Sequence, residues 1–226
     1  MISIAIDGPA GAGKSTIAKR LAARFGCIYV DTGALYRTVA YGAVKSGILP
    51  EDTDGVLRLI GKTEIDIAYR DGEQIVLLNG ENVSEFIRTP EISAYASRVS
   101  AVPQVRAFLL GLQRKLATEH DVVMDGRDIA TVVLPSATVK IFLTASAEKR
   151  ARRRYDALVA KGMDVKFEDV LGDLLERDHR DSTREIAPLK PAEDSITVDT
   201  TDLVLEEAID AAAEVIENVL KSGDKN

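Results

Sequence analysis

The feature that most constrains this chain is a glycine-rich segment close to its first residue. The segment reads Gly8-Pro9-Ala10-Gly11-Ala12-Gly13-Lys14-Ser15 and matches the pattern G-x-x-x-x-G-K-[ST]. An apolar run at residues 2–7 predicts a strand before it, and the pattern at residues 15–25 predicts a helix after it. In that setting the backbone N–H groups converge on phosphate oxygens, so we expect ATP to bind there. The expected ATP-binding residues are Gly8, Pro9, Ala10, Gly11, Ala12, Gly13, Lys14, Ser15 and Thr16.

Two side chains of this loop carry the expected chemistry. Lys14 can reach the β- and γ-phosphates, and the Ser15 hydroxyl can ligate Mg²⁺. A loop of this kind specifies the donor of a phosphoryl group but not its acceptor. The acceptor must therefore be identified from residues elsewhere in the chain.

The rest of the chain alternates short apolar runs with helical patterns. This alternation is typical of βαβ units and predicts an α/β fold, with a parallel sheet covered by helices on both faces. The expected strands are residues 2–7, 27–31, 121–125, 139–143 and 196–198; the expected helices are 15–25, 102–118, 147–160, 167–181 and 205–220. Residues 64–83 differ, because polar and apolar residues alternate there and Asp71-Gly72 and Asn79-Gly80 supply turns. We expect a small antiparallel insert, either beside the substrate site or purely structural.

Composition excludes several classes of function. The formal net charge of −7 argues against general binding of nucleic acid, which needs a basic surface. No basic leader precedes the first strand and no apolar run reaches membrane-spanning length, so we expect a cytoplasmic protein without a membrane partner. Cys27 is the only cysteine, so no intrachain disulfide can form.

Charged residues after the loop suggest where an acceptor binds. Asp125 ends an apolar run, where a carboxylate can organise Mg²⁺ through water, although an ordinary turn carboxylate fits as well. Thr32 lies at an expected helix start with Arg37 one turn later, which suits an anion. Two sets of charged residues share helical faces and can point at a transferred phosphoryl group: Arg177, Asp181 and Arg184, and Arg150, Arg153 and Arg154. A solvated helix surface with Glu–Arg pairs is the alternative.

Four segments together closely resemble bacterial cytidylate kinases, of the nucleoside monophosphate kinase family. They are residues 8–16, DTGALYR at 31–37, DGRD at 125–128 and RDHRDSTREIAPL at 177–189. The resemblance implies a single P-loop kinase domain over residues 1–226, with a parallel sheet flanked by helices, an antiparallel insert and a short helical lid. The implied parts are a core at 1–35, 111–147 and 162–226, a monophosphate-binding region at 36–110 with the insert at 64–83, and a lid at 148–161.

The resemblance also implies roles for particular residues. Ser97, Arg106 and Asp128 would contact the cytosine, and Arg177 and Asp181 the ribose. Arg37, Arg127 and Arg184 would hold the acceptor phosphate, while Arg150, Arg153 and Arg154 would close onto ATP. The expected catalytic residues are Lys14, Arg127, Arg150, Arg153, Arg154 and Arg184; the expected CMP-binding residues are Thr32, Tyr36, Arg37, Ser97, Arg106, Arg127, Asp128, Arg177, Asp181 and Arg184; the expected Mg²⁺ ligands are Ser15 and, through water, Asp125.

The expected activity is therefore ATP-dependent phosphorylation of CMP and dCMP by a monomer that uses Mg²⁺. One alternative is a P-loop kinase for another small acceptor, such as UMP, AMP or a sugar acid. A GTP-binding switch is a weaker alternative, because the sequence contains no N-K-x-D motif for reading guanine. The only D-x-x-G near mid-chain, residues 52–55, precedes no expected strand and is interpreted as a loop.

Overall fold

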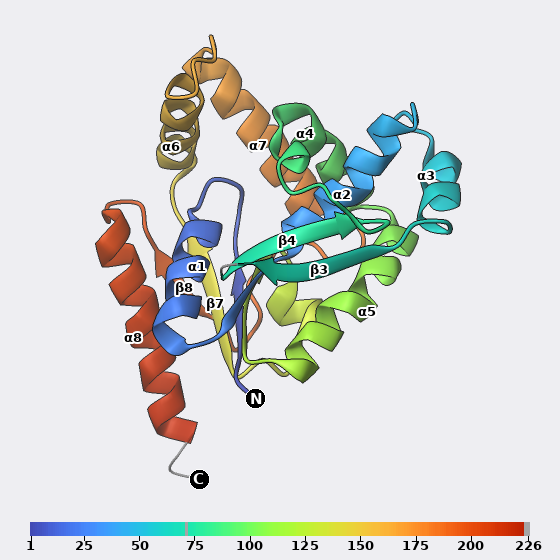
Figure 1. Cartoon of the computed structure of the whole chain (residues 1–226). Coiled ribbons are helices and arrows are strands. Elements are labelled where there is room, and N and C mark those ends of the chain that lie inside the picture. Colours follow the sequence, from blue (N-terminus) through green and yellow to red (C-terminus); the bar gives the residue numbers. More distant parts are fainter. Residues whose placement is uncertain (71, 224–226) are drawn as a thin grey trace. The chain divides into compact units, whose positions relative to one another are not determined.

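The computed structural model describes residues 1–70 and 72–223, so Asp71 of the predicted turn lies outside the described residues (Figure 1). The chain divides into two compact units. Unit 1 comprises Met1 and Ile28–Val122, and unit 2 comprises Ile2–Cys27 and Val123–Asn226. The boundaries predicted for core, monophosphate-binding region and lid stay predictions.

A five-stranded sheet has the order β2-β6-β1-β7-β8. Strand β1 pairs in parallel with β7, and β7 pairs in parallel with β8. This confirms the parallel sheet predicted from the apolar runs, with strand ends that differ by about one residue, as is usual for such assignments. The strands are β1 Ser3–Asp7, β2 Ile28–Asp31, β6 Val122–Gly126, β7 Val139–Thr144 and β8 Ile196–Asp199.

The helices of unit 2 begin with α1, which follows the glycine-rich loop directly. Its helices are α1 Lys14–Phe25, the π-helix η2 Ile129–Val133, α6 Ala147–Val159, α7 Phe167–Thr183 and α8 Leu205–Gly223. Helix α1 lies beside α8, where Arg20 pairs with Glu206 (Figure 1). Helices α6 and α7 pack together, and the rings of Tyr155 and Phe167 meet edge to face. Most side chains of β1 and alternate side chains of β7 are buried, so both strands belong to the core of unit 2.

Unit 1 contains strand β2, the insert and the remaining described helices. Its elements besides β2 are α2 Thr32–Lys45, α3 Thr53–Ile60, β3 Ile65–Arg70, β4 Glu73–Leu78, β5 Glu81–Asn82, the 3-10 helix η1 Phe86–Arg88, α4 Pro90–Val99 and α5 Pro103–Glu119. Strands β3, β4 and β5 form the predicted antiparallel sheet. Asn79 and Gly80 both have positive φ, the backbone that a tight Asn-Gly hairpin turn requires.

The interpretation of residues 52–55 as a loop is wrong. The Asp52 side chain accepts a hydrogen bond from the backbone N–H of Gly55 at 2.8 Å and caps helix α3. Short amphipathic helices with a single aspartate cap give a weak sequence signal, which explains the error.

No helix among the described residues is long and apolar enough to cross a membrane.

Candidate active site

The glycine-rich loop after β1 adopts a conformation that only glycine allows at several positions. Gly8, Gly11 and Gly13 have φ values of 150°, 76° and 85°. A Cβ added at Gly8 would lie 1.9 Å from the backbone oxygen of Leu143 in β7, so no side chain fits there. Gly13 precedes the first turn of α1, whose free N–H groups favour an anion. The loop therefore has the geometry of a phosphate site.

Lys14 is the buried cation of this loop. Its Nζ donates a hydrogen bond to the backbone oxygen of Pro9 at 2.8 Å. Burial lowers the pKa of Lys14 well below its usual value, and the nearby positive charge of Arg127 lowers it further, while Asp125 opposes the change. A buried ammonium among like charges gains stability when a polyanion arrives, so this group is suited to binding phosphate.

Ser15 and Asp125 meet beside the loop. The Ser15 hydroxyl donates to Asp125 Oδ2 at 3.0 Å, and Asp125 is buried at the end of β6. Hydroxyl and carboxylate oxygens are ligands that Mg²⁺ accepts. No cluster of three or more His, Cys, Asp or Glu side chains suited to a metal occurs within residues 1–70 and 72–223. Two oxygen donors of this kind fit a Mg²⁺ ion that takes further oxygen ligands from water or from a phosphate.

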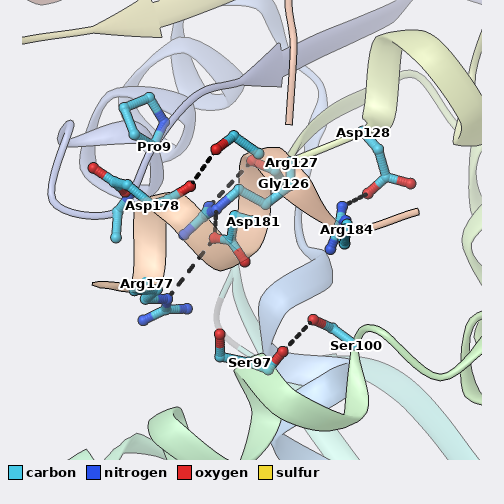
Figure 2. Close-up of polar contacts among 12 residues, drawn as sticks. Pro9, Ser97, Ser100, Gly126, Arg127, Asp128, Arg177, Asp178, Asp181 and Arg184 are labelled. Atoms are coloured by element: carbon cyan, nitrogen blue, oxygen red, sulfur yellow. Dashed lines mark hydrogen bonds and ion pairs between the residues drawn. The ribbon is translucent and has the colours of Figure 1, made fainter. Parts of the chain in front are cut away.

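Two arginines meet at the Asp181 carboxylate of α7 (Figure 2). Arg127 Nε donates to Asp181 Oδ2 at 2.9 Å, and Arg177 Nε lies 4.0 Å from the same oxygen. Burial works to raise the pKa of Asp181, but Arg127 and Arg177 lower it below its usual value. Asp181 thus stays ionised and fixes both guanidinium groups, which excludes a solvated helix surface at this position.

Arg184 pairs with the buried carboxylate of Asp128. Both residues were predicted from the sequence to bind CMP. The two side chains are each 6% exposed, and Arg184 Nη2 lies 3.4 Å from Asp128 Oδ1 (Figure 2). Arg184 Nε also donates to the backbone oxygen of Ala187 at 2.5 Å. Unit 2 therefore holds a cluster of buried and half-buried charged groups that influence one another electrostatically: Lys14, Asp125, Arg127, Asp128, Arg177, Asp181 and Arg184.

The sequence analysis missed Asp7, the last residue of β1. Its carboxylate accepts hydrogen bonds from the backbone N–H groups of Ile129 and Ala130 at 2.8 and 2.7 Å. Burial raises the pKa of Asp7 to about 6, although these two N–H groups oppose the rise. Asp7 thereby joins the start of the phosphate loop to the segment that carries Arg127 and Asp128. An aspartate directly before the glycine-rich loop was the available signal.

The three arginines expected to close onto ATP have different surroundings. Arg150 is buried, donates to the backbone oxygen of Ala10 at 2.9 Å and pairs with Asp178 at 2.5 Å. Asp178 also accepts from the backbone N–H of Ala10, so this pair holds the phosphate loop. Arg153 donates to the backbone oxygen of Thr200 at 2.7 Å, and Arg154 is half-buried. The movement of these three arginines onto ATP stays a prediction. Asp178 was not among the residues predicted from the sequence.

In unit 1 the expected site residues gather at the start of α2 and along α4 and α5. Asp31 caps α2 and pairs with Arg37 Nη2 at 2.7 Å. The Ser97 hydroxyl is buried without a hydrogen-bond partner among the described residues, whereas the backbone oxygen of Ser97 accepts from Ser100 (Figure 2). Arg106 lies over the ring of Tyr36, and Thr32 is buried beside Asp31. A buried, unpaired hydroxyl suits a site that a polar ligand completes.

A parallel sheet whose first strand runs into a glycine-rich loop, a buried lysine and a hydroxyl–carboxylate pair defines a P-loop nucleotide-binding protein. Comparison with known proteins gives the particular family. A family model described as cytidylate kinase matches residues 4–218. A cytidylate kinase from Carboxydothermus hydrogenoformans is 53% identical over 94% of this chain and 96% of its own. One from Caldicellulosiruptor bescii is 50% identical over 98% of each chain.

The chain belongs to the cytidylate kinase family. Among solved structures, a shikimate kinase from Bacteroides thetaiotaomicron covers 97% of this chain and 98% of its own at 11% identity, with a TM-score of 0.49. A likeness at that distance carries no argument about function.

Asp7 should make the stability of the fold fall as the pH rises toward neutrality. Its pKa is about 6 in the folded chain, against 3.8 for an ordinary aspartate. Because the folded state holds this proton more tightly, the contribution is complete below pH 3.8 and is lost as the pH rises through about 6. From about pH 5 to about pH 7.5, the free energy of unfolding of the wild type should fall by about 1 kcal/mol relative to Asp7→Asn, which does not titrate. Urea unfolding measures both; the same pH dependence in the two proteins would contradict the assignment.

Proposed function

We propose that this chain transfers the γ-phosphoryl group of ATP to CMP and dCMP, giving ADP and CDP or dCDP. The observation that carries the proposal is the buried charge cluster of unit 2. There a phosphate-loop lysine lies within electrostatic reach of Arg127 and Arg177, which Asp181 fixes in place. Membership of the cytidylate kinase family supports a pyrimidine monophosphate as the acceptor.

Ser97, Arg106 and Asp128 read the cytosine in this proposal. A carboxylate accepts a hydrogen bond from the cytosine amino group, and a guanidinium donates to its ring nitrogen or carbonyl oxygen. The buried hydroxyl of Ser97, which has no hydrogen-bond partner in the part of the chain that the structure describes, supports a polar ligand at this position. Uracil presents a carbonyl where cytosine presents an amino group, so a buried acceptor would stay unpaired against UMP.

Arginines hold the ribose and phosphates of the acceptor. Arg177 and Asp181 bind the ribose, and Arg37, Arg127 and Arg184 bind the phosphate. The buried Arg37 Nε has no hydrogen-bond partner among the described residues, which leaves a donor for a phosphate oxygen. Thr32 and Tyr36 complete this group of contacts.

The reaction is an in-line displacement at the γ-phosphorus of ATP. A phosphate oxygen of CMP forms the new bond, the bond from the γ-phosphorus to the bridging oxygen breaks, and ADP leaves with that electron pair. The nucleophile is already an anion at neutral pH, so no general base is needed. Lys14 and the arginines lower the barrier by positioning both nucleotides and by stabilising charge on the transferred group.

Ser15 and, through water, Asp125 would hold Mg²⁺ in this proposal. When bound with ATP, the ion neutralises charge on the β- and γ-phosphates. Arg150, Arg153 and Arg154 would close over the triphosphate and exclude water that could otherwise hydrolyse ATP. Arg150 already contacts the loop through the backbone oxygen of Ala10.

A substrate panel tests the proposed acceptor. In a coupled assay of ADP release, CMP and dCMP should be phosphorylated, and kcat/KM for UMP should be lower by about a hundredfold or more. AMP should be inactive because its larger ring does not fit contacts for a pyrimidine. Activity on AMP alone would contradict the proposal, and equal turnover of UMP and CMP would remove Asp128 and Arg106 as readers of the base.

Arg184→Met tests the proposed stabilisation of the transferred group. Its kcat should fall by about a hundredfold, the usual loss when one preorganised charge is removed from a transition state. Arg180→Met is the matched control, since Arg180 lies on α7 and pairs with the exposed Glu176. The control should retain kcat, and urea unfolding of both variants separates lost catalysis from lost stability. An unchanged kcat in Arg184→Met would remove Arg184 from the mechanism.

A further inference from the structure

Two residues of the insert reach from its hairpin to strand β2. Tyr69 of β3 and Gln74 of β4 lie directly opposite each other in the antiparallel register. The Tyr69 hydroxyl donates to the backbone oxygen of Tyr29 at 3.0 Å. Gln74 Oε1 accepts from the backbone N–H of Asp31 at 2.7 Å, and its Nε2 lies 3.4 Å from the Asp31 carbonyl oxygen. The pair therefore holds β2 through backbone groups of residues 29 and 31, which point to the same edge of the strand.

Asp31 connects this contact with the start of α2. Its Oδ1 accepts from the backbone N–H of Ala34 at 2.9 Å and caps the helix. Its Oδ2 lies 2.7 Å from Arg37 Nη2 and 3.4 Å from Arg88 Nη2. Burial works to raise the pKa of Asp31, but Arg37 and Arg88 lower it below its usual value. The carboxylate is thus charged and sets the direction of Arg37.

We propose that Tyr69 and Gln74 are positioning residues for the acceptor phosphate, acting through Asp31 on Arg37. This inference rests on the proposed function, in which Arg37 binds the phosphate of CMP. The insert fixes the backbone of Asp31, Asp31 fixes one nitrogen of the guanidinium, and the buried Arg37 Nε is left without a protein partner among the described residues. One side of the guanidinium is anchored while another donor stays available for a ligand.

The arrangement has a physical reason. Asp31 ends its strand and begins a helix, so its backbone groups need hydrogen-bond partners there. A side-chain amide supplies a donor and an acceptor together, and the N–H of Asp31 fixes which end of the Gln74 amide faces it. A displacement of about 1 Å at a phosphate-binding arginine is enough to cost substantial rate or affinity. The hairpin therefore helps to position Arg37 for its contact with the acceptor phosphate, although no residue of the hairpin contacts the phosphate in this proposal.

Gln74→Leu and Tyr69→Phe test the proposal in the full chain. Gln74→Leu removes both hydrogen bonds to Asp31 at similar size, and Tyr69→Phe removes one hydroxyl while the ring remains. In each variant KM for CMP should rise by about fivefold or more, the order expected when at least one hydrogen bond is lost, while KM for ATP should change by less than about twofold. Glu81→Gln is the matched control, because it removes the exposed ion pair with Lys45 in the same insert and should alter neither value.

A double-mutant cycle with Arg37→Met separates positioning from general support of the fold. If Gln74 acts through Arg37, Gln74→Leu should raise KM for CMP little further once Arg37 is replaced. Additive losses, or an equal rise of both KM values, would overturn the inference. So would unchanged KM for CMP in both Tyr69→Phe and Gln74→Leu while the wild type phosphorylates CMP. Absence of CMP phosphorylation in the wild type would instead reject the proposed function.

Discussion

Burial of positive charge at the end of the parallel sheet is the constraint on which the site depends. Lys14 is buried near Arg127, and the cost of keeping both charged is offset only partly by Asp125 and Asp7. Asp181 compensates for Arg127 and Arg177 in turn. A bound polyphosphate would supply the missing negative charge. Its binding is therefore favoured by the repulsion between the buried positive charges, which it reduces. Asp7 and Asp125 stand on the neighbouring buried strands β1 and β6, which fixes their places beside Lys14.

Local patterns in the sequence predicted the backbone elements that surround this site. The glycines at 8, 11 and 13 are favoured because all three have positive φ, and contact with β7 excludes any side chain at Gly8. Buried parallel strands appear as continuous apolar runs, which explains why all five were found within about one residue. Arg177, Asp181 and Arg184 were recognised from helical spacing, and the structure shows Asp181 contacting Arg177 as that spacing implied.

The sequence could not predict contacts between residues that are distant along the chain. Asp7 binds N–H groups of residues 129 and 130, Asp178 binds the loop at Ala10, and Gln74 binds Asp31. No spacing rule connects such positions, since folding alone brings them together. Helix α3 was missed for a different reason, because one aspartate cap before a short amphipathic stretch resembles a turn. These missed residues support the groups that the sequence identified.

Burial and neighbouring positive charge lower the pKa of Lys14 in the phosphate loop, and a bound polyphosphate should raise this pKa again. An NMR titration of isotope-labelled lysine side chains measures the pKa of Lys14 directly, with the Lys14→Arg variant used to assign its signal. The account predicts a pKa well below the usual lysine value in the free protein and a clear rise with a non-hydrolysable ATP analogue bound. An ordinary pKa in the free protein, or one that the analogue leaves unchanged, would contradict it.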